Sequence, residues 1–325
     1  METGKGRLLG IDTVRYAAFV AVVLIHTVGS DSVNEYGVNA GAVLGQMSRF
    51  AVPFFFIASG YFLAQREQKA VIALINVMKR IVPVFLFWLL FYVSITDGGI
   101  ARLLNVRFLL SCLVSGGPGY HLWFLPSLSL SAAMLILLRG RGWFTIFSIA
   151  IIFYVTGLTL GSYKEILQIG FDFPFNTRNG PFHGFLFILV GYWIAKAKPV
   201  YPVWAAVSLC VLGMLLHLSE AFFLDFAHFR PFAANDFLLG TVPFGIGTFL
   251  LSLKLPSDIP AIRKLSDLGT YSLGLYGIHL LFVLAIHDRN AGLPRSLADT
   301  LVILLMSTLS CMLLVRVKVL RRLLR

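Results

Sequence analysis

Three ionisable side chains interrupt the first apolar stretch of the sequence, IDTVRYAAFVAVVLIHT: Asp12, Arg15 and His26. Arg15 and His26 are eleven residues apart, close to three turns of an α-helix, so they share one face and lie roughly 16 Å apart along the axis. Asp12 and Arg15 can pair across a single turn. A guanidinium binds phosphate groups, and a neutral imidazole can take a proton or accept an acyl group. The pattern therefore predicts a helix with an anion-binding group at one end and a general base or acyl acceptor at the other.

Taken one at a time, these side chains also have simpler interpretations. Arg15 could extend to the lipid headgroups, and a histidine near a helix end is commonly an interfacial residue. The shared face favours a functional role, because a stripe of helix facing lipid would not carry both groups.

Two further segments place polar residues at predicted helix ends. SRFAVPFFFIASGYFL carries Arg49 at its outer end and the pair Ser59-Gly60 in its inner half. MKRIVPVFLFW places Lys79 and Arg80 at an inner membrane boundary, just before a proline. By themselves, these two cations are equally typical of the basic residues that mark cytoplasmic loops.

Two more segments combine histidine with aromatic residues. GYHLWFL contains His121 and Trp123, and on physical grounds alone the tryptophan is typical of an aromatic anchor at the membrane surface. TYSLGLYGIHLLFV contains Tyr276 and His279, three residues apart and therefore on one helix face. A buried histidine such as His279 can also serve only to bond neighbouring helices.

The composition identifies the elements that must position these residues. Of the 325 residues, 58% are hydrophobic and only 13% are charged, against about 25% charged in soluble domains. The three cysteines have no metal-binding spacing, and neither a phosphate-binding glycine loop nor a metalloprotease or hydrolase motif is present. We predict an all-α membrane bundle, a single domain over residues 1–325 without a separate soluble domain, and no bound metal.

Apolar stretches near membrane-spanning length recur along the chain. The predicted spans are 11–29, 49–65, 80–96, 120–138, 143–161, 181–195, 200–218, 236–253, 268–286 and 297–315. Residues 103–114 form a shorter apolar piece with Arg102 and Arg107 at or near its start, which favours an interfacial or re-entrant segment over an eleventh span.

Charge placement gives this topology an orientation. With the amino terminus inside, two thirds of the 27 basic residues fall on the inner side and two thirds of the 15 acidic residues on the outer side. Cytoplasmic loops are enriched in Lys and Arg, so ten spans with both termini in the cytoplasm are self-consistent. The net charge of +12 is thus a sign of topology, and we predict no nucleic-acid partner.

These segments resemble, in order, motifs of the acyltransferase type 3 family, bacterial inner-membrane O-acyltransferases. Arg15 and His26 match the family's Arg, ten residues, His signature, and Val52-Pro53 through Ser59-Gly60 match the following segment. The basic residues before Pro83, YHLWF and YSLGLYGIHLLF resemble the later motifs. The likeness covers nearly the whole chain.

The chain is most similar to compact members that resemble the O-acetyltransferase of enterobacterial common antigen. Compact members lack the extracytoplasmic hydrolase-like domain of some relatives, and we expect the same here. One departure is Tyr16, where many relatives have glycine.

The resemblance implies transfer of an acetyl group from cytosolic acetyl-CoA to a hydroxyl of an extracytoplasmic or lipid-linked glycan. His26 would be the general base or a transient acetyl acceptor, and Asp12 would orient Arg15. The donor would contact Arg15, Lys79, Arg80, Ser59 and Gly60, with a nucleophilic Ser59 as an alternative. The acceptor would contact Arg49, His121, Trp123, Tyr276 and His279.

A different class of protein would also suit buried Arg and His in a bundle containing Gly and Pro. A transporter or flippase of a small polar or glycan substrate is the alternative prediction. The sequence shows no pair of matching interrupted helices in two halves, which weakens that reading. A membrane scaffold is disfavoured by the number of ionisable residues within the spans.

Overall fold

The computed structural model describes residues 8–28, 35–66, 68–172, 176–256, 258–288 and 292–324. Lys5, Arg7, Asp31, Arg289 and Arg325, which the topology prediction uses, lie outside these ranges. Within them every regular element is a helix and none is a strand, so the prediction of an all-α protein is confirmed. All three cysteines are free thiols.

The chain forms two compact units, which are described separately. The first comprises Met1–Phe55, Val200–Asn235 and Leu239–Arg325. Its helices are α1 (Leu9–Thr27), α2 (Ala40–Met47), the start of α3 (Ala51–Ala64), α9 (Val203–Phe226), α10 (Thr241–Ser252), α11 (Pro260–Gly269), α12 (Ser272–Ile286), α13 (Leu293–Leu314) and α14 (Lys318–Leu324). The short 3-10 turns Ser48–Phe50 and Phe232–Ala234 also belong to it.

The second unit comprises Phe56–Pro199 and Asp236–Leu238. It contains the rest of α3, α4 (Ala70–Ser94), α5 (Val106–Ser115), α6 (Phe124–Leu138), α7 (Trp143–Thr159) and α8 (Pro181–Ala197), with 3-10 turns at Gly99–Leu104 and Tyr120–Trp123. α8 packs against both α6 and α7, and α4 packs against α6.

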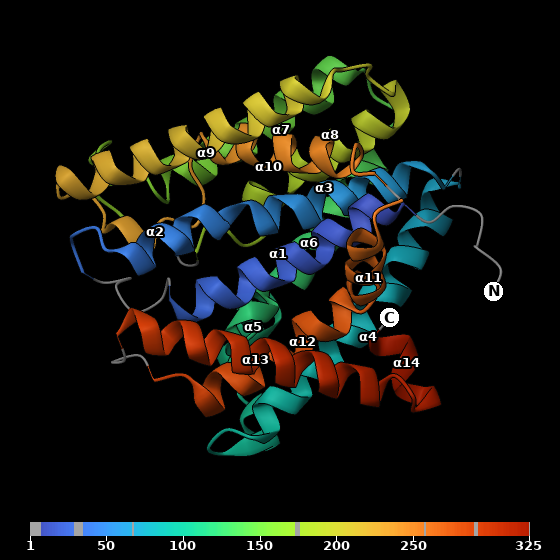
Figure 1. Ribbon diagram of the computed structural model, residues 1–325, viewed down its shortest axis with the longest axis vertical. Coiled ribbons are helices and arrows are strands. Elements are labelled where there is room, and N and C mark those ends of the chain that lie inside the picture. The colour runs from blue at the N-terminus through green and yellow to red at the C-terminus, as the bar shows by residue number, and fades with distance from the viewer. Residues whose placement is uncertain are drawn as a thin grey trace. The chain divides into compact units, whose positions relative to one another are not determined.

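Helix α1 is the centre of the first unit. It contacts α2, α10, α11, α12 and α13 (Figure 1). The Thr13 hydroxyl donates to the Ile262 carbonyl of α11 at 3.0 Å. Gly269 of α11 lies so close to α1 that an added Cβ would be 1.7 Å from the Asp12 carbonyl oxygen. The backbone of the ionisable end of α1 is thus fixed by α11.

Each predicted span coincides with helix, but the helices differ in length. Among the described residues, six helical segments are long and apolar enough to cross a membrane, and the pair α11 and α12, bent by 72°, would make a seventh. The helices α7, α8 and α10 are shorter apolar helices of 17, 17 and 12 residues. The protein therefore has the helices of a polytopic membrane protein, while the count of ten spans and the cytoplasmic termini remain predictions.

Two helix starts differ from the sequence prediction. Helix α4 begins at Ala70, ten residues before the expected start, so Lys79 and Arg80 lie in the middle of a helix of 25 residues. Residues Ala40–Ala64 form one membrane-length segment, so Arg49 lies within it and not at its end. The short α5, with ten residues, occupies the piece predicted to be interfacial or re-entrant.

Two glycines bring α3 and α8 together within the second unit. A Cβ on Gly60 would lie 1.9 Å from the Ile188 carbonyl oxygen, and a Cβ on Gly191 would lie 1.9 Å from the Ile57 carbonyl oxygen. Small residues permit such close backbone approach between membrane helices. Gly60 and Gly191 thus allow close packing of α3 against α8.

We expect Gly60→Ala to destabilise the protein by about 1–3 kcal/mol, because the added methyl forces α3 and α8 apart. The measurement is the midpoint of thermal unfolding of the purified protein in detergent. Gly142→Ala is the matched control, since a Cβ there meets open space and its φ of −62° suits alanine. Equal midpoints for the two variants would contradict a tight α3–α8 contact.

The predicted orientation can be measured by labelling single cysteines from outside intact cells. Glu165→Cys should react with a membrane-impermeant maleimide, and Gly140→Cys should react only after the membrane is opened. Both positions are solvent-exposed in the structure, so side-chain burial does not distinguish them. The reverse labelling pattern would invert the topology.

Candidate functional site

The predicted ion pair is present at the amino-terminal end of α1. Arg15 donates from Nη1 to Asp12 Oδ1 at 2.8 Å. The carboxylate is 8% exposed and the guanidinium 24% exposed. Pairing lowers the cost of holding both charges in a poorly solvated position. The Arg15 guanidinium is thereby held against Asp12, while part of it stays accessible to solvent.

At the opposite end of α1, His26 lies against His279 of α12. The two imidazole rings are stacked, with centroids 5.6 Å apart and an angle of 23° between their planes. His26 is half-buried and His279 is completely buried. Two histidines from motifs more than 250 residues apart in the sequence are therefore neighbours, which places His279 beside the predicted base.

The hydrogen bonding of His279 fixes its orientation. Its Nδ1 lies 3.2 Å from the Leu275 carbonyl oxygen, which can only accept, so Nδ1 carries the proton and Nε2 carries the lone pair of the neutral ring. Tyr276 lies near it, with ring centroids 6.1 Å apart. Phe19 of α1 meets its ring edge-on at 6.1 Å. His279 is thus a rigid ring beside His26.

A polar cluster that sequence reasoning missed lies next to His26 along the chain. Thr27 and Thr300 share a buried hydrogen bond of 2.7 Å between their hydroxyls. Beside Thr300, the Asp299 carboxylate accepts from Arg295 Nε at 2.9 Å and lies 3.6 Å from His287 Nδ1. The only sequence signal was the i, i+4 spacing of Arg295 and Asp299, because His287 comes from another helix end.

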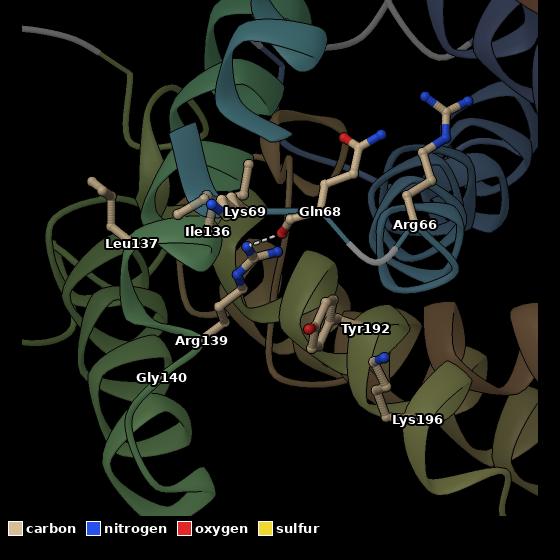
Figure 2. Close-up of a pocket in the computed structure, with 10 residues that line it drawn as sticks. Arg66, Gln68, Lys69, Ile136, Leu137, Arg139, Gly140, Tyr192 and Lys196 are labelled. Atoms are coloured by element: carbon tan, nitrogen blue, oxygen red, sulfur yellow. Dashed lines mark hydrogen bonds between the residues drawn. The ribbon is translucent and has the colours of Figure 1, made fainter. Parts of the chain in front are cut away.

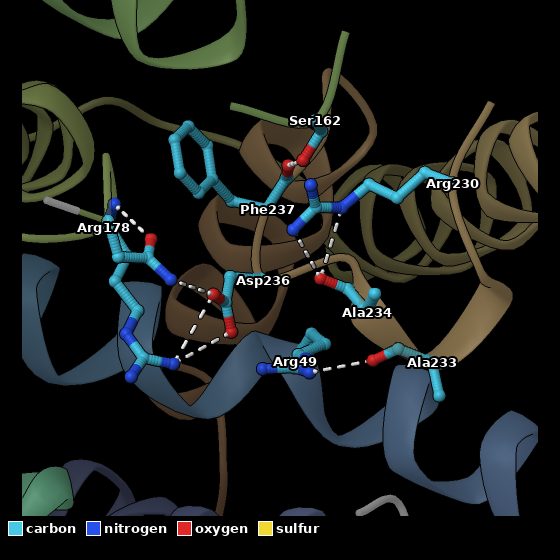
Figure 3. A network of polar contacts seen from close by, with 9 residues as sticks. Arg49, Ser162, Arg178, Arg230, Ala233, Ala234, Asp236 and Phe237 are labelled. Atoms are coloured by element: carbon cyan, nitrogen blue, oxygen red, sulfur yellow. Dashed lines mark hydrogen bonds and ion pairs between the residues drawn. The ribbon is translucent and has the colours of Figure 1, made fainter. Parts of the chain in front are cut away.

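Arg49 contacts the protein's own backbone in the first unit. Its Nη2 donates to the Ala233 carbonyl at 3.3 Å (Figure 3). The neighbouring Gln46 donates to the Phe232 carbonyl at 2.9 Å and lies 2.8 Å from His217 Nε2. These contacts tie the 3-10 turn Phe232–Ala234 to the helix that carries Arg49. The predicted acceptor contact of Arg49 remains a prediction.

In the second unit, His121 and Trp123 are buried rather than facing lipid. His121 is 2% exposed and meets the Tyr92 ring edge-on, with centroids 5.3 Å apart. Trp123 is 9% exposed, and the Arg178 guanidinium lies 5.2 Å from the centre of its ring. Arg178 in turn pairs with Asp236 at 3.2 Å (Figure 3). An aromatic anchor at the membrane surface would be more exposed than this tryptophan.

The predicted donor contacts on α3 and α4 differ in their surroundings. Ser59 is half-buried, and Gly60 is enclosed at the α8 contact. Lys79 and Arg80 are exposed on the surface of α4. The second unit also has a pocket on its surface, and neither of these two cations is among the described residues that line it.

That pocket has a volume of about 740 Å³ and is strongly basic (Figure 2). Three segments form it: the turn between α3 and α4, the carboxyl end of α6 and the carboxyl end of α8. Its described lining consists of Arg66, Gln68, Lys69, Ala70, Ile136, Leu137, Arg139, Gly140, Tyr192 and Lys196. The four cations among them, Arg66, Lys69, Arg139 and Lys196, all belong to the basic residues of the predicted inner side.

No metal centre is evident in the part of the chain that the structure describes. There, no group of three or more His, Cys, Asp or Glu side chains is arranged to hold a metal ion. The predicted absence of a metal stays a prediction.

Comparisons with curated proteins find racemases that are similar to this chain. Among curated proteins, an amino-acid racemase of Enterococcus faecalis is 26% identical over 97% of this chain and 47% of its own length. A second amino-acid racemase of that organism is 30% identical over 59% of this chain and 29% of its length. A serine/alanine racemase of Enterococcus gallinarum is 26% identical over 92% of this chain and 44% of its length.

This chain thus spans about half the length, or less, of these curated relatives. No solved structure matches it. The decisive comparison is with a family model described as an acyltransferase domain, which matches residues 8–316, including α1 with Asp12, Arg15 and His26. The chain therefore belongs to the acyltransferase 3 family.

Proposed function

We propose that this enzyme is an O-acetyltransferase of the bacterial inner membrane. It moves an acetyl group from cytosolic acetyl-CoA to a hydroxyl of an extracytoplasmic or lipid-linked surface glycan. The family supports acyl transfer, and the apolar helices support a membrane location. The observation that carries the proposal is the stack of His26 on His279, at the other end of α1 from the Asp12–Arg15 pair.

The chemistry assigned to His26 conserves atoms and protons. The acceptor oxygen attacks the thioester carbonyl, the carbon–sulfur bond breaks, and coenzyme A leaves as a thiolate. Neutral His26 takes the proton of the hydroxyl and returns it to the thiolate. In the alternative route, a ring nitrogen of His26 first accepts the acetyl group as the thiolate leaves. The hydroxyl oxygen then takes the acetyl group, and its proton passes to the thiolate. Both routes require the same neutral ring at the same place.

His279 acts as a positioning residue in this proposal. Its ring is fixed by the Nδ1–H bond to Leu275 and by the edge of Phe19. Stacking on this ring restricts the rotamers of the half-buried His26. A catalytic base held in a single orientation loses less entropy on reaching the transition state. Tyr276, on the same face, is a proposed contact for the acceptor.

Arg15 serves the donor in the proposal. A guanidinium suits the phosphates of acetyl-CoA because it can form two parallel hydrogen bonds to one anion. Asp12 holds one side of the fork, at 2.8 Å, and so sets its direction. The roughly 16 Å along α1 between Arg15 and His26 separates the anionic part of the donor from the reacting thioester.

The names of the curated relatives do not change this proposal. The serine/alanine racemase and the amino-acid racemases are proteins of which this chain covers less than half. The family matched over residues 8–316 describes acyl transfer, so we assign acyl transfer to the part that this chain shares with them.

Replacing His26 with alanine should reduce acetyl transfer by at least about a hundredfold, the usual contribution of a general base. The assay uses membranes, radiolabelled acetyl-CoA and surface glycans. His228→Ala is the control, because His228 is exposed at the end of α9 and has no assigned role. Undiminished glycan acetylation by His26→Ala would exclude His26 as base and as acetyl acceptor. Glycan movement without acetylation by the wild type would instead favour a flippase.

Replacing Arg15 with glutamine should weaken acetyl-CoA binding about tenfold through the loss of a charged contact to phosphate. Binding is measured by calorimetry on the purified protein in detergent. Asp12→Asn removes the partner's charge but keeps the guanidinium, so it should bind acetyl-CoA at least as tightly as the wild type. Unchanged affinity in Arg15→Gln would remove Arg15 from the donor path.

A further inference from the structure

The basic pocket of the second unit has the dimensions of a small-molecule site. Its volume of about 740 Å³ lies within the usual range for ligand pockets, roughly 300–1,000 Å³. The turn between α3 and α4 forms one wall, and the ends of α6 and α8 form the others (Figure 2). The predicted topology places all three segments on the cytoplasmic side.

Four cations are among the residues that line this pocket: Arg66, Lys69, Arg139 and Lys196. None of its described lining residues carries a carboxylate. Glu67, which lies between two of them in the sequence, is outside the described residues. Like charges gathered on one concave surface repel each other, and a bound anion relieves that repulsion. A basic concave surface of this kind attracts a ligand with more than one negative charge.

The simplest alternative is that these cations only stabilise helix ends. It suits Arg139 and Lys196, because basic residues at the carboxyl ends of helices interact favourably with the helix dipole. Stabilisation of a helix end does not explain Lys69, which is the N-cap residue of α4 and makes no side-chain capping bond. A cation is unfavourable at a helix amino terminus, where the first backbone N–H groups attract anions. An anion bound in the pocket would meet both Lys69 and the start of α4.

The wall that carries Lys69 is held in place by hydrogen bonds. Arg139 donates from Nη2 to the Gln68 backbone carbonyl, and the Gln68 side chain accepts from Asn76 at 2.9 Å. These bonds link the turn to α6 and to α4. Hydrogen-bond donors that are already held in place lose little conformational entropy when a ligand binds.

One side of the pocket suits a flat apolar group. Tyr192 is half-buried, with its ring 6.2 Å from that of Trp143, and it lies one turn before Lys196 on α8. Ile136 and Leu137 add apolar surface from α6. Aromatic side chains provide stacking surfaces for nucleotide bases. Cations beside an aromatic ring thus fit a phosphate ester that carries a base or an acyl chain.

We propose that this pocket binds the phosphate groups of a phosphate ester, with Arg66, Lys69, Arg139, Lys196 and the amino terminus of α4 as its ligands. Two sources supply this chemistry: a soluble nucleotide, such as the 3′-phosphoadenosine diphosphate part of an acyl donor, and the headgroup of an anionic phospholipid.

The test uses the full-length protein in nanodiscs of phosphatidylcholine, with adenosine 3′-phosphate 5′-diphosphate as the probe. Binding is measured by calorimetry for the wild type and for the double variant Arg66→Gln, Lys196→Gln, whose two side chains are exposed. The loss of two charged contacts should weaken binding by about tenfold or more. Arg141→Gln is the matched control, since Arg141 is an exposed cation outside the pocket lining.

A second arm measures phosphatidylglycerol retained by the same proteins in native mass spectrometry. Weaker nucleotide binding in the double variant alone supports the pocket with the donor as ligand. A loss of retained phosphatidylglycerol with unchanged nucleotide binding supports the pocket with a lipid headgroup as ligand. No change in either measurement, or an equal loss in Arg141→Gln, overturns the proposal.

The probe has no acyl group, so this experiment is independent of His26. A wild type that binds the nucleotide but never transfers acetyl would refute the proposed function and leave the pocket intact. A protein that transfers acetyl while the double variant keeps full nucleotide and lipid binding would refute the pocket alone.

Discussion

The cost of an ionised or unpaired polar group in a poorly solvated interior governs where this protein places its chemistry. Such a group within a membrane span costs several kcal/mol unless it is paired or reaches water. Arg15 is accordingly paired with Asp12, and Asp299 lies between Arg295 and His287. Each of these arrangements ties a polar group to a neighbour of fixed position. The same constraint that makes polar residues rare in the helices therefore makes the remaining ones well oriented.

Close backbone contact supplies the rigidity that these polar groups need. Gly269 lets α11 lie directly on the backbone of Asp12, and Gly60 and Gly191 do the same for α3 and α8. In lipid, helices gain little from burying apolar side chains against each other, so small residues and interhelical hydrogen bonds decide the packing. The position of the Asp12–Arg15 pair is thus a consequence of a glycine more than 250 residues away in the sequence.

The two units carry different groups of polar residues. The first holds α1 and the stacked histidines, which suit proton or acyl transfer. The second holds a basic pocket with an aromatic wall, which suits a phosphate ester. A soluble polyanion meets cations most readily where water is present, whereas an imidazole base works best where water is scarce. These opposite requirements favour separate places for an anion site and for a base.

The sequence by itself determined the all-α membrane class, the Asp12–Arg15 pair and the likeness to the acyltransferase 3 family, because composition and helical spacing are local properties. Only the tertiary structure decided that His279 stacks on His26, that Trp123 is buried under Arg178, and that four cations from three separate segments share one pocket. Those contacts join segments far apart in the chain. Their geometry depends on helix packing, which spacing along one helix does not encode.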